Sequence, residues 1–531
     1  MTSHLSVLTS HTVTASSEER VSIRTWIAVL GTVLGAFMAV LDIQITNASL
    51  REITGGIAST AVEASWVSTS YLIGEIITIP LTAWLGRVFG VRLYLLVNVT
   101  LFLVFSGLCG TASGLTQMIV YRALQGFTGG VMIPMSFTVI NTQLPPSRRA
   151  VGLVLFGITA TLAPAVGPYI GGLLTDNYGW PMVFYVNLLP GAVMLATVFF
   201  AIDPEPLNLP LLWKGDWLGT VFMAIGLGSL IAFLEEGQND DWFTSVFIQR
   251  CFALAVIFIP LFIICELISK TPVVNLRLLR VRNLGLASAV NFLLGASLYG
   301  SVFLLPEYLE QVQNYSASQT GEAMVLIGLP QLLIFPFVPR LMRAFDLRLI
   351  VFAGALIFGG SCLLNIHMNP DFGGPQFQFG NVIRALGQPF TIVPLSALAT
   401  AGLLREQQAD GSALFNIMRN LGGSVGTALL STMITQREQF HDFRIGERVT
   451  PYSPYVQQFL SNQSAQNLQH SGDPAGALQQ AYRMLQASVQ TNSFVMAYSE
   501  CFLALGVMLI VGAGMIWLCN KAKAGGATAA H

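Results

Sequence analysis

The sequence contains about fourteen apolar runs, most of them about 20 residues long, separated by polar segments. A hydrocarbon core about 30 Å thick needs about 20 apolar residues for each helix that crosses it. These runs therefore predict an all-α polytopic membrane protein with about 14 transmembrane helices. We expect the spans at residues 25–48, 64–85, 93–112, 115–140, 149–173, 182–202, 216–234, 247–268, 284–305, 320–341, 347–367, 378–402, 412–435 and 494–519.

The overall composition points the same way. Hydrophobic residues make up 53% of the chain and charged residues 10%, whereas soluble domains carry about 25% charged residues. The polar N-terminal segment contains Glu18, Glu19 and Arg20, unlike a signal peptide, so the first span is expected to remain as an anchor. The six cysteines lie in or beside the spans without CxxC spacing, which indicates packing residues and no metal site.

The basic residues are distributed unevenly between the two sides of the membrane. With the N-terminus inside, 17 of the 26 Lys and Arg residues fall in cytoplasmic segments, and this asymmetry predicts that both termini are cytoplasmic. The cytoplasmic set is Arg20, Arg24, Arg87, Arg92, Arg148, Arg149, Lys214, Lys270, Arg277, Arg280, Arg282, Arg340, Arg343, Arg348, Arg405, Lys521 and Lys523.

An internal repeat divides the chain. The segment 87–93 recurs at 343–349 and the segment 121–124 recurs at 383–386, with offsets of 256 and 262 residues. Nearly equal offsets are expected for two parallel halves of a transporter. We therefore expect a six-helix half over 1–202, two inserted helices over 203–283, and a second six-helix half over 284–531 with a long external, periplasmic loop at 436–492. This loop is rich in Gln, Ser and Asn, and the alternatives for it are a partly helical or a mobile segment.

The run 149–173 holds a motif that is unfavourable for a helix in water. Pro164, Gly167, Pro168, Gly171 and Gly172 lie within ten residues, and proline and glycine cost about 3 and 1 kcal/mol relative to alanine in such a helix. Close helix packing in a membrane would offset this cost. The stretch resembles the antiporter signature GxxxGPxxGG of the major facilitator superfamily, which implies an exchanger. The alternative is that these residues serve only tight packing.

Three further motifs carry a more specific resemblance. Residues 41–47 read LDIQITN, similar to LDxTxVN, residues 122–126 match RxxQG, and residues 180–191 resemble WRWxFxxNxPxG. The chain thus resembles the EmrB/QacA-type drug:proton antiporters of the major facilitator superfamily, a group with fourteen spans. One departure is Arg87, which stands where the superfamily usually has an aspartate.

Ionisable residues inside the predicted spans are the candidates for proton coupling. Asp42 and Arg122 both lie about 10 Å below the outer face of the membrane by helix rise, so they could pair. An aspartate that gains and loses an arginine partner could bind and release a proton. The alternative is a permanent ion pair that only positions two helices. Arg384 is the repeat counterpart of Arg122, but no carboxylate corresponds to Asp42 in the second half.

Glu75 lies near the middle of its span, at the depth where transporter substrate sites usually lie. It is a second coupling candidate, and its alternative is a simple hydrogen bond to a neighbouring helix. Polar residues in other spans are candidates for the substrate cavity, with cross-helix hydrogen bonding as the alternative. These are Gln44, Asn47, Gln125, Asn291 and Arg384.

The sequence lacks the P-loop pattern GxxxxGK[ST], so export would draw on an ion gradient. We expect no enzymatic activity, no cofactor and no nucleic-acid partner. The expected function is proton-coupled efflux of hydrophobic or amphipathic toxic compounds across a bacterial inner membrane. The resemblance also implies a periplasmic adaptor and an outer-membrane channel. The alternatives are a dedicated exporter of one endogenous metabolite, such as a siderophore or fatty acid, and a non-transporting membrane receptor or scaffold.

Overall fold

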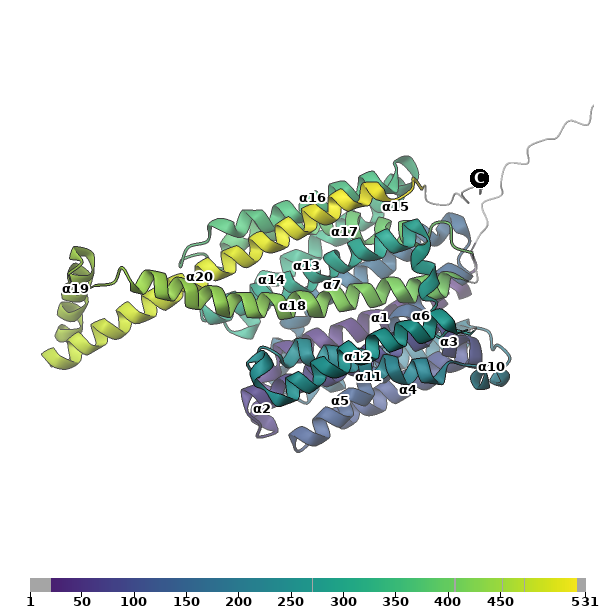
Figure 1. Ribbon diagram of the computed structural model, residues 1–531, viewed down its shortest axis with the longest axis horizontal. Coiled ribbons are helices and arrows are strands. Elements are labelled where there is room, and N and C mark those ends of the chain that lie inside the picture. Colours follow the sequence, from purple (N-terminus) through teal and green to yellow (C-terminus); the bar gives the residue numbers. More distant parts are fainter. Residues whose placement is uncertain (1–20, 270, 405–406, 451, 472, 523–531) are drawn as a thin grey trace, which may run out of the picture.

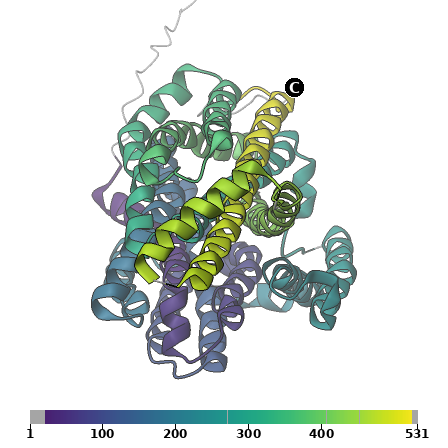
Figure 2. The ribbon, with the colours of Figure 1, turned by 90° about the vertical axis from the view of Figure 1, so that its left-hand side faces the viewer.

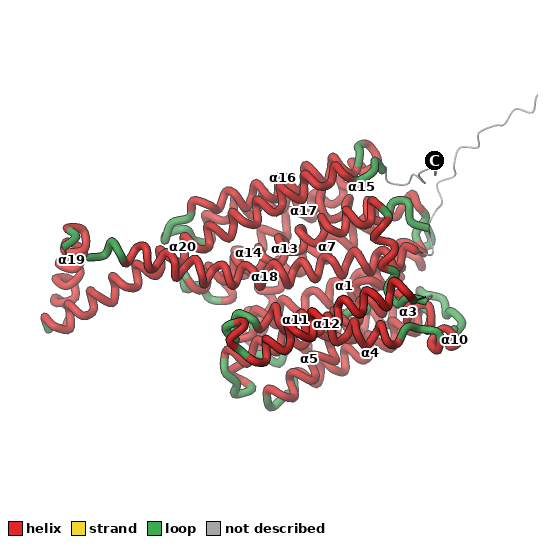
Figure 3. Tube along the Cα trace, in the orientation of Figure 1, coloured by secondary structure: helices red, strands yellow, loops and turns green. Residues whose placement is uncertain are grey.

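The computed structural model describes residues 21–522 except 270, 405–406, 451 and 472. All regular structure in this part of the chain is helical (Figure 3). Thirteen of its helical segments are long and apolar enough to cross a membrane. The predicted spanning-helix fold is therefore confirmed. The basic and acidic residues that we expected at Glu18, Glu19, Arg20, Lys270, Arg405 and Lys523 lie outside the described residues.

The first bundle is built from the N-terminal helices. They are α1 (Ile23–Ala48), the short α2 (Leu50–Gly56), α3 (Ala61–Phe89), α4 (Val91–Cys109), α5 (Leu115–Gly129), α6 (Met132–Gln143), α7 (Pro146–Tyr178), α8 (Met182–Tyr185) and α9 (Leu188–Ala201). The inserted helices follow, as α10 (Leu209–Trp213), α11 (Trp217–Glu236), η1 (Trp242–Thr244) and α12 (Val246–Ile268). Figure 1 shows α11 and α12 side by side along the first bundle, where α11 packs against α3.

The second bundle contains the remaining spans. Its elements are η2 (Leu276–Arg280), α13 (Arg282–Gln311), α14 (Ala317–Ile334), η3 (Phe335–Phe337), α15 (Val338–Ala344), α16 (Leu347–Leu363), η4 (Leu364–His367), α17 (Gly374–Thr400), α18 (Gln408–Gly446), α19 (Pro454–Ser471), α20 (Pro474–Met515) and η6 (Ile516–Leu518). The predicted run 412–435 lies within α18. This helix is absent from the thirteen because polar residues such as Asn416, Arg419 and Asn420 interrupt its apolar sequence.

Some predicted spans consist of two helices in succession. The span expected at 115–140 is α5 followed by α6, with Gly130 and Val131 between them. The span expected at 320–341 changes to a 3-10 turn at Phe335–Phe337, which contains Pro336. Proline lacks a backbone N–H and glycine adopts many conformations, so both residues favour interruptions of a helix.

The two bundles meet along pairs of long helices. Helix α7 of the first bundle packs against α14 and α17 of the second, and α3 packs against α18. The inserted helix α11 contacts α18 as well as α3. Helix α7 therefore carries the glycine- and proline-rich motif at the contact between the two bundles.

The segment 436–492, expected as a long external loop with a helical alternative, is mostly helical. It comprises the end of α18, the whole of α19 and the first part of α20. These helices extend beyond the end of the bundles (Figure 1), and Figure 2 shows α19 and the outer part of α20 in front of them. Residues 475–487 are rich in Ala, Gln, Leu and Met, which favour helix. The division of the chain into two halves and an insertion, with boundaries at residues 203 and 284, stays a proposal.

Candidate functional site

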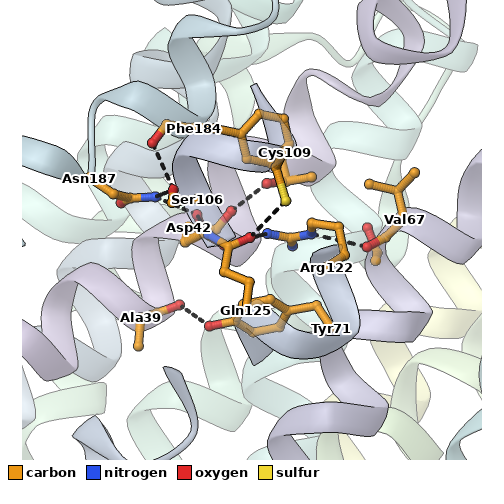
Figure 4. A network of polar contacts seen from close by, with 12 residues as sticks. Ala39, Asp42, Val67, Tyr71, Ser106, Cys109, Arg122, Gln125, Phe184 and Asn187 are labelled. Atoms are coloured by element: carbon orange, nitrogen blue, oxygen red, sulfur yellow. Dashed lines mark hydrogen bonds and ion pairs between the residues drawn. The ribbon is translucent and has the colours of Figure 1, made fainter. Parts of the chain in front are cut away.

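Asp42 on α1 and Arg122 on α5 form a fully buried ion pair inside the first bundle (Figure 4). Arg122 Nη1 donates to Asp42 Oδ2 at 2.6 Å, and Arg122 Nε donates to the carbonyl of Val67 on α3 at 3.1 Å. The guanidinium carbon lies 4.4 Å from the ring centroid of Tyr71, in cation–π contact. Both charges therefore have partners, as charges at this depth in a membrane require.

Two amide side chains complete the surroundings of the carboxylate. Gln125 Nε2 donates to Asp42 Oδ1 at 3.1 Å, and Asn187 Nδ2 donates to the same oxygen at 2.5 Å. Gln125 Oε1 accepts from Arg122 Nη1 at 2.7 Å. Because a guanidinium only donates hydrogen bonds, Gln125 must turn its oxygen to Arg122 and its nitrogen to Asp42. Every one of these partners donates to Asp42, which suits an ionised carboxylate.

The hydrogen-bond network continues to residues that the sequence did not single out. Asn187 Nδ2 lies 3.1 Å from Ser106 Oγ on α4, and Ser106 donates to the carbonyl of Phe184 on α8 at 2.8 Å. Tyr71 also donates to the carbonyl of Ala39 on α1 at 3.4 Å. In the sequence, Ser106 could have been recognised as a hydroxyl residue inside the apolar run 93–112.

Glu75 lies on α3, one helical turn after Tyr71, and is 4% exposed. No hydrogen bond joins its carboxylate to the described residues. The positive charge that acts on it most strongly is Arg419 on α18, ahead of Arg122. Arg419 also acts on Tyr299 of α13. Glu75 is thus not hydrogen-bonded to the Asp42 network, although the charges of Arg122 and Asp42 act on it together with that of Arg419. In the sequence, Arg419 is recognisable as a basic residue inside the predicted span 412–435.

The five candidates for the substrate cavity do not share one site. Gln125 belongs to the Asp42 network, Asn47 is exposed and accepts from Ser68 at 2.5 Å, and Asn291 donates to the carbonyl of Phe415 at 2.7 Å. Gln44 packs next to Gly167 of α7. Arg384 is buried in the second bundle. Only Gln125 therefore lies with the coupling candidates.

The motif on α7 is packed on two sides. A Cβ atom at Gly167 would lie 2.4 Å from Gln44 Cβ, and one at Gly171 would lie 2.9 Å from the carbonyl oxygen of Ile45, both on α1. On the other side, a Cβ atom at Gly321 of α14 would lie 2.5 Å from Cα of Tyr169. Pro164, Pro168 and Gly172 of the motif are buried as well. The motif therefore lets α7 approach both the helix of Asp42 and the opposite bundle.

Arg87, the departure from the superfamily pattern, also joins the two bundles. Its Nη2 lies 3.6 Å from Oδ1 of Asp410 at the start of α18. The Arg87 side chain is 48% exposed and that of Asp410 is 10% exposed. The acid of this contact is thus on α18 and the base on α3.

Comparisons with known proteins identify the family of this chain. Residues 32–427 match the family model of the Major Facilitator Superfamily. The chain belongs to the Major Facilitator Superfamily. A solved structure of another superfamily member, the proton:xylose symporter XylE, matches with a TM-score of 0.57 at 14% identity, covering 95% of this chain and 98% of that one. This likeness concerns the fold alone.

Within the superfamily, the chain is similar to several named resistance proteins. It is 32% identical to the colistin resistance protein EmrB of Acinetobacter baumannii, over 94% of this chain and 97% of that protein. It is 31% identical to the multidrug export protein EmrB of Escherichia coli K12, over 94% and 96%. It is 29% identical to the fatty acid resistance protein FarB of Neisseria gonorrhoeae, over 91% and 94%. The expected resemblance to the EmrB type is confirmed.

Proposed function

We propose that this chain is a multidrug efflux antiporter that exports hydrophobic or amphipathic toxic compounds in exchange for protons. The observation that carries the proton part is the Asp42 site, a buried carboxylate held by Arg122, Gln125 and Asn187. The drug part is supported by the relatives that are named for colistin resistance and multidrug export.

The proton exchange would work through the hydrogen bonds of Asp42. Protonation of Asp42 removes its negative charge and leaves the buried guanidinium of Arg122 without a counter-charge, which is strongly unfavourable. Proton binding therefore requires the surroundings of Asp42 to rearrange. Release of the proton restores the ionised arrangement with Arg122. In this way each protonation state favours its own arrangement of the side chains that join α1 and α5.

A rearrangement at Asp42 can be transmitted to the contact between the bundles through helices α1 and α7. Helix α1 carries Asp42 and packs against Gly167 and Gly171 of α7, and α7 packs against α14 of the second bundle. A shift of α1 would change the packing of α7, and packed helices tend to switch between discrete arrangements. Alternating access to a substrate site between the bundles would follow. Glu75 is the second proposed coupling residue, because it lies on α3, which packs against α18, and is acted on by the charge of Arg419 on that helix.

The energy would come from the proton gradient without a bound cofactor. One proton crossing a potential of roughly 150 mV supplies about 3.5 kcal/mol. This corresponds to a concentration ratio of a few hundred. One or two protons per exported molecule would therefore be sufficient.

We place the protein in a bacterial inner membrane with both termini in the cytoplasm. The extension formed by α18, α19 and α20 would then project into the periplasm, where it would suit docking of a membrane-fusion adaptor that leads to an outer-membrane channel. Its side chains include exposed aromatic residues, Phe443, Tyr455 and Tyr482, and aromatic residues are enriched in protein interfaces.

A second candidate function is dedicated export of one endogenous metabolite. The similarity to the fatty acid resistance protein FarB supports this candidate. The test is transport into inverted membrane vesicles with an imposed proton gradient, using a cationic dye, an uncharged hydrophobic compound and a long-chain fatty acid. We expect wild-type protein to move more than one class and Asp42→Asn to move none. Movement of the fatty acid alone would favour the dedicated exporter, and no movement at all would favour a scaffold.

A further inference from the structure

Arg384 on α17 is a buried arginine without a counter-charge. Its side chain is 4% exposed, and no ion pair in the described part of the chain involves it. Its Nε and Nη2 atoms are buried without a hydrogen-bond acceptor. The guanidinium carbon lies 5.4 Å from the ring centroid of Phe358, in cation–π contact. A buried charge without a partner is strongly unfavourable, so this site needs a negative group.

A small cavity adjoins this guanidinium. It is lined by polar side chains from several helices and by two phenylalanine rings. Its volume of about 10 Å³ is close to the space that one water-sized particle needs. The lining side chains that bear on its polarity are Ser301, Ser361, Asn365, Asn381 and Arg384. The cavity therefore suits a monatomic occupant and excludes a drug-sized molecule.

The internal repeat identifies the chemistry of that occupant. Offsets of 256 and 262 residues place the counterpart of Asp42 between positions 298 and 304, a range that has no carboxylate and contains Ser301. Ser301 lines the cavity beside Arg384. In the first bundle the corresponding arginine, Arg122, meets the carboxylate of Asp42 at 2.6 Å. The cavity thus lies where the first bundle has its negative charge.

The donors around the cavity also suit an anion. Asn365 makes no hydrogen bond to the described residues, so its amide N–H groups are available to an occupant, together with the unpaired N–H groups of Arg384. The amide nitrogen of Asn381 is engaged with the carbonyl of Ala323 at 3.1 Å and holds the side of the cavity in place. No acidic side chain lines the cavity. We propose that the second bundle binds a small monovalent anion of the chloride type between the N–H groups of Arg384 and Asn365, as a structural replacement for a carboxylate. Ser301 lies beside this site, with its hydroxyl donating to the carbonyl of Ser297 at 2.6 Å.

The first test compares chloride with gluconate, an anion too large for the cavity, at equal ionic strength. We expect the full-length protein in detergent to melt about 2 °C or more higher in chloride. Arg384→Gln should lose this difference, whereas Arg340→Gln, at an exposed position, should keep it. Equal melting temperatures of the wild type in both salts would overturn the proposal, as would a chloride effect that survives Arg384→Gln.

A second variant covers the case in which Arg384→Gln fails to fold. Ser301→Asp places a covalent carboxylate at the repeat position of Asp42. We expect this variant to be as stable in gluconate as the wild type is in chloride, and no longer to respond to chloride. A Ser301→Asp protein that still gains stability from chloride would contradict the site.

Direct observation can decide between an anion and water. Crystals of the wild-type protein grown in bromide should show an anomalous peak beside Arg384, and crystals of Ser301→Asp should not. Density without an anomalous signal in the wild type would mean that the cavity holds only water, which would overturn the proposal. These readouts do not depend on transport, so they separate the anion site from the proposed antiport.

Discussion

Asp42 and Arg122 are 80 residues apart in the chain, yet Arg122 Nη1 lies 2.6 Å from Asp42 Oδ2 and both side chains are fully buried. Removing one partner of such a pair typically costs about 3–5 kcal/mol. The pair therefore stabilises the contact of α1 with α5 whether or not it also carries protons. Variants that preserve the attraction and move the titrating group separate these two roles.

The first prediction concerns the exchanged pair, Asp42→Arg with Arg122→Asp. The double variant keeps one positive and one negative group in contact, so we expect it to recover expression and folding that either single variant loses. It should not recover proton-driven export, because the carboxylate is then on another helix. Expression, melting temperature and vesicle transport are the measurements. Full recovery of transport would indicate a purely structural pair and would direct attention to Glu75.

The second prediction concerns Asn187, whose amide donates to Asp42 at 2.5 Å. A hydrogen bond to a charged group is worth about 1.5–3 kcal/mol, so Asn187→Ala should slow proton-coupled export by about tenfold or more. Asn177→Ala is the control, because Asn177 is exposed and donates to the carbonyl of Leu173 in its own helix. Equal transport rates for the two variants would show that Asn187 does not support Asp42.

The third prediction concerns the close approach of α7 to α1. A side chain at Gly171 meets the carbonyl oxygen of Ile45, whereas one at Gly107 meets no atom within 4 Å. Gly171→Leu should therefore destabilise the protein by about 1–3 kcal/mol, and either block export or make vesicles leak protons. Gly107→Leu should do neither. Normal export and normal proton tightness of Gly171→Leu would indicate that the motif only provides surface packing.

The sequence predicted the spans well because a run of about 20 apolar residues has few alternatives to a membrane helix. It also allowed the pairing of Asp42 with Arg122, because depth along a helix follows from counting residues. It could not place Asn187 and Ser106 around the pair, since that requires the rotation and tilt of four helices. These quantities depend on tertiary packing and are not encoded locally.

Two other features show the same limit. The polar composition of 436–492 left open whether this external segment is partly helical or mobile, and its good helix formers continue α18 and α20 beyond the bundles. The substrate-cavity candidates were chosen for being polar inside spans. The structure distributes Asn47, Asn291 and Arg384 over separate contacts, because polarity alone does not say which face of a helix a residue occupies.

The fourth prediction concerns the contact between Arg87 and Asp410, 3.6 Å apart across the two bundles. Partly exposed ion pairs contribute at most about 1 kcal/mol, so Arg87→Asp should change the melting temperature little. It should still slow transport, because two acids then repel each other where α3 meets α18. Adding Asp410→Arg should restore the rate. If the double variant is no faster than Arg87→Asp, the attraction across this contact is not required for transport.

The most direct test of the account measures protons and substrate together in proteoliposomes that contain the purified protein. Wild-type protein should move protons inward, down an imposed gradient, only as substrate moves outward, in a fixed ratio. Asp42→Asn should still bind substrate but should move neither protons nor substrate against its gradient. Substrate-coupled proton movement by Asp42→Asn in the wild-type ratio would contradict the central claim that Asp42 carries the proton.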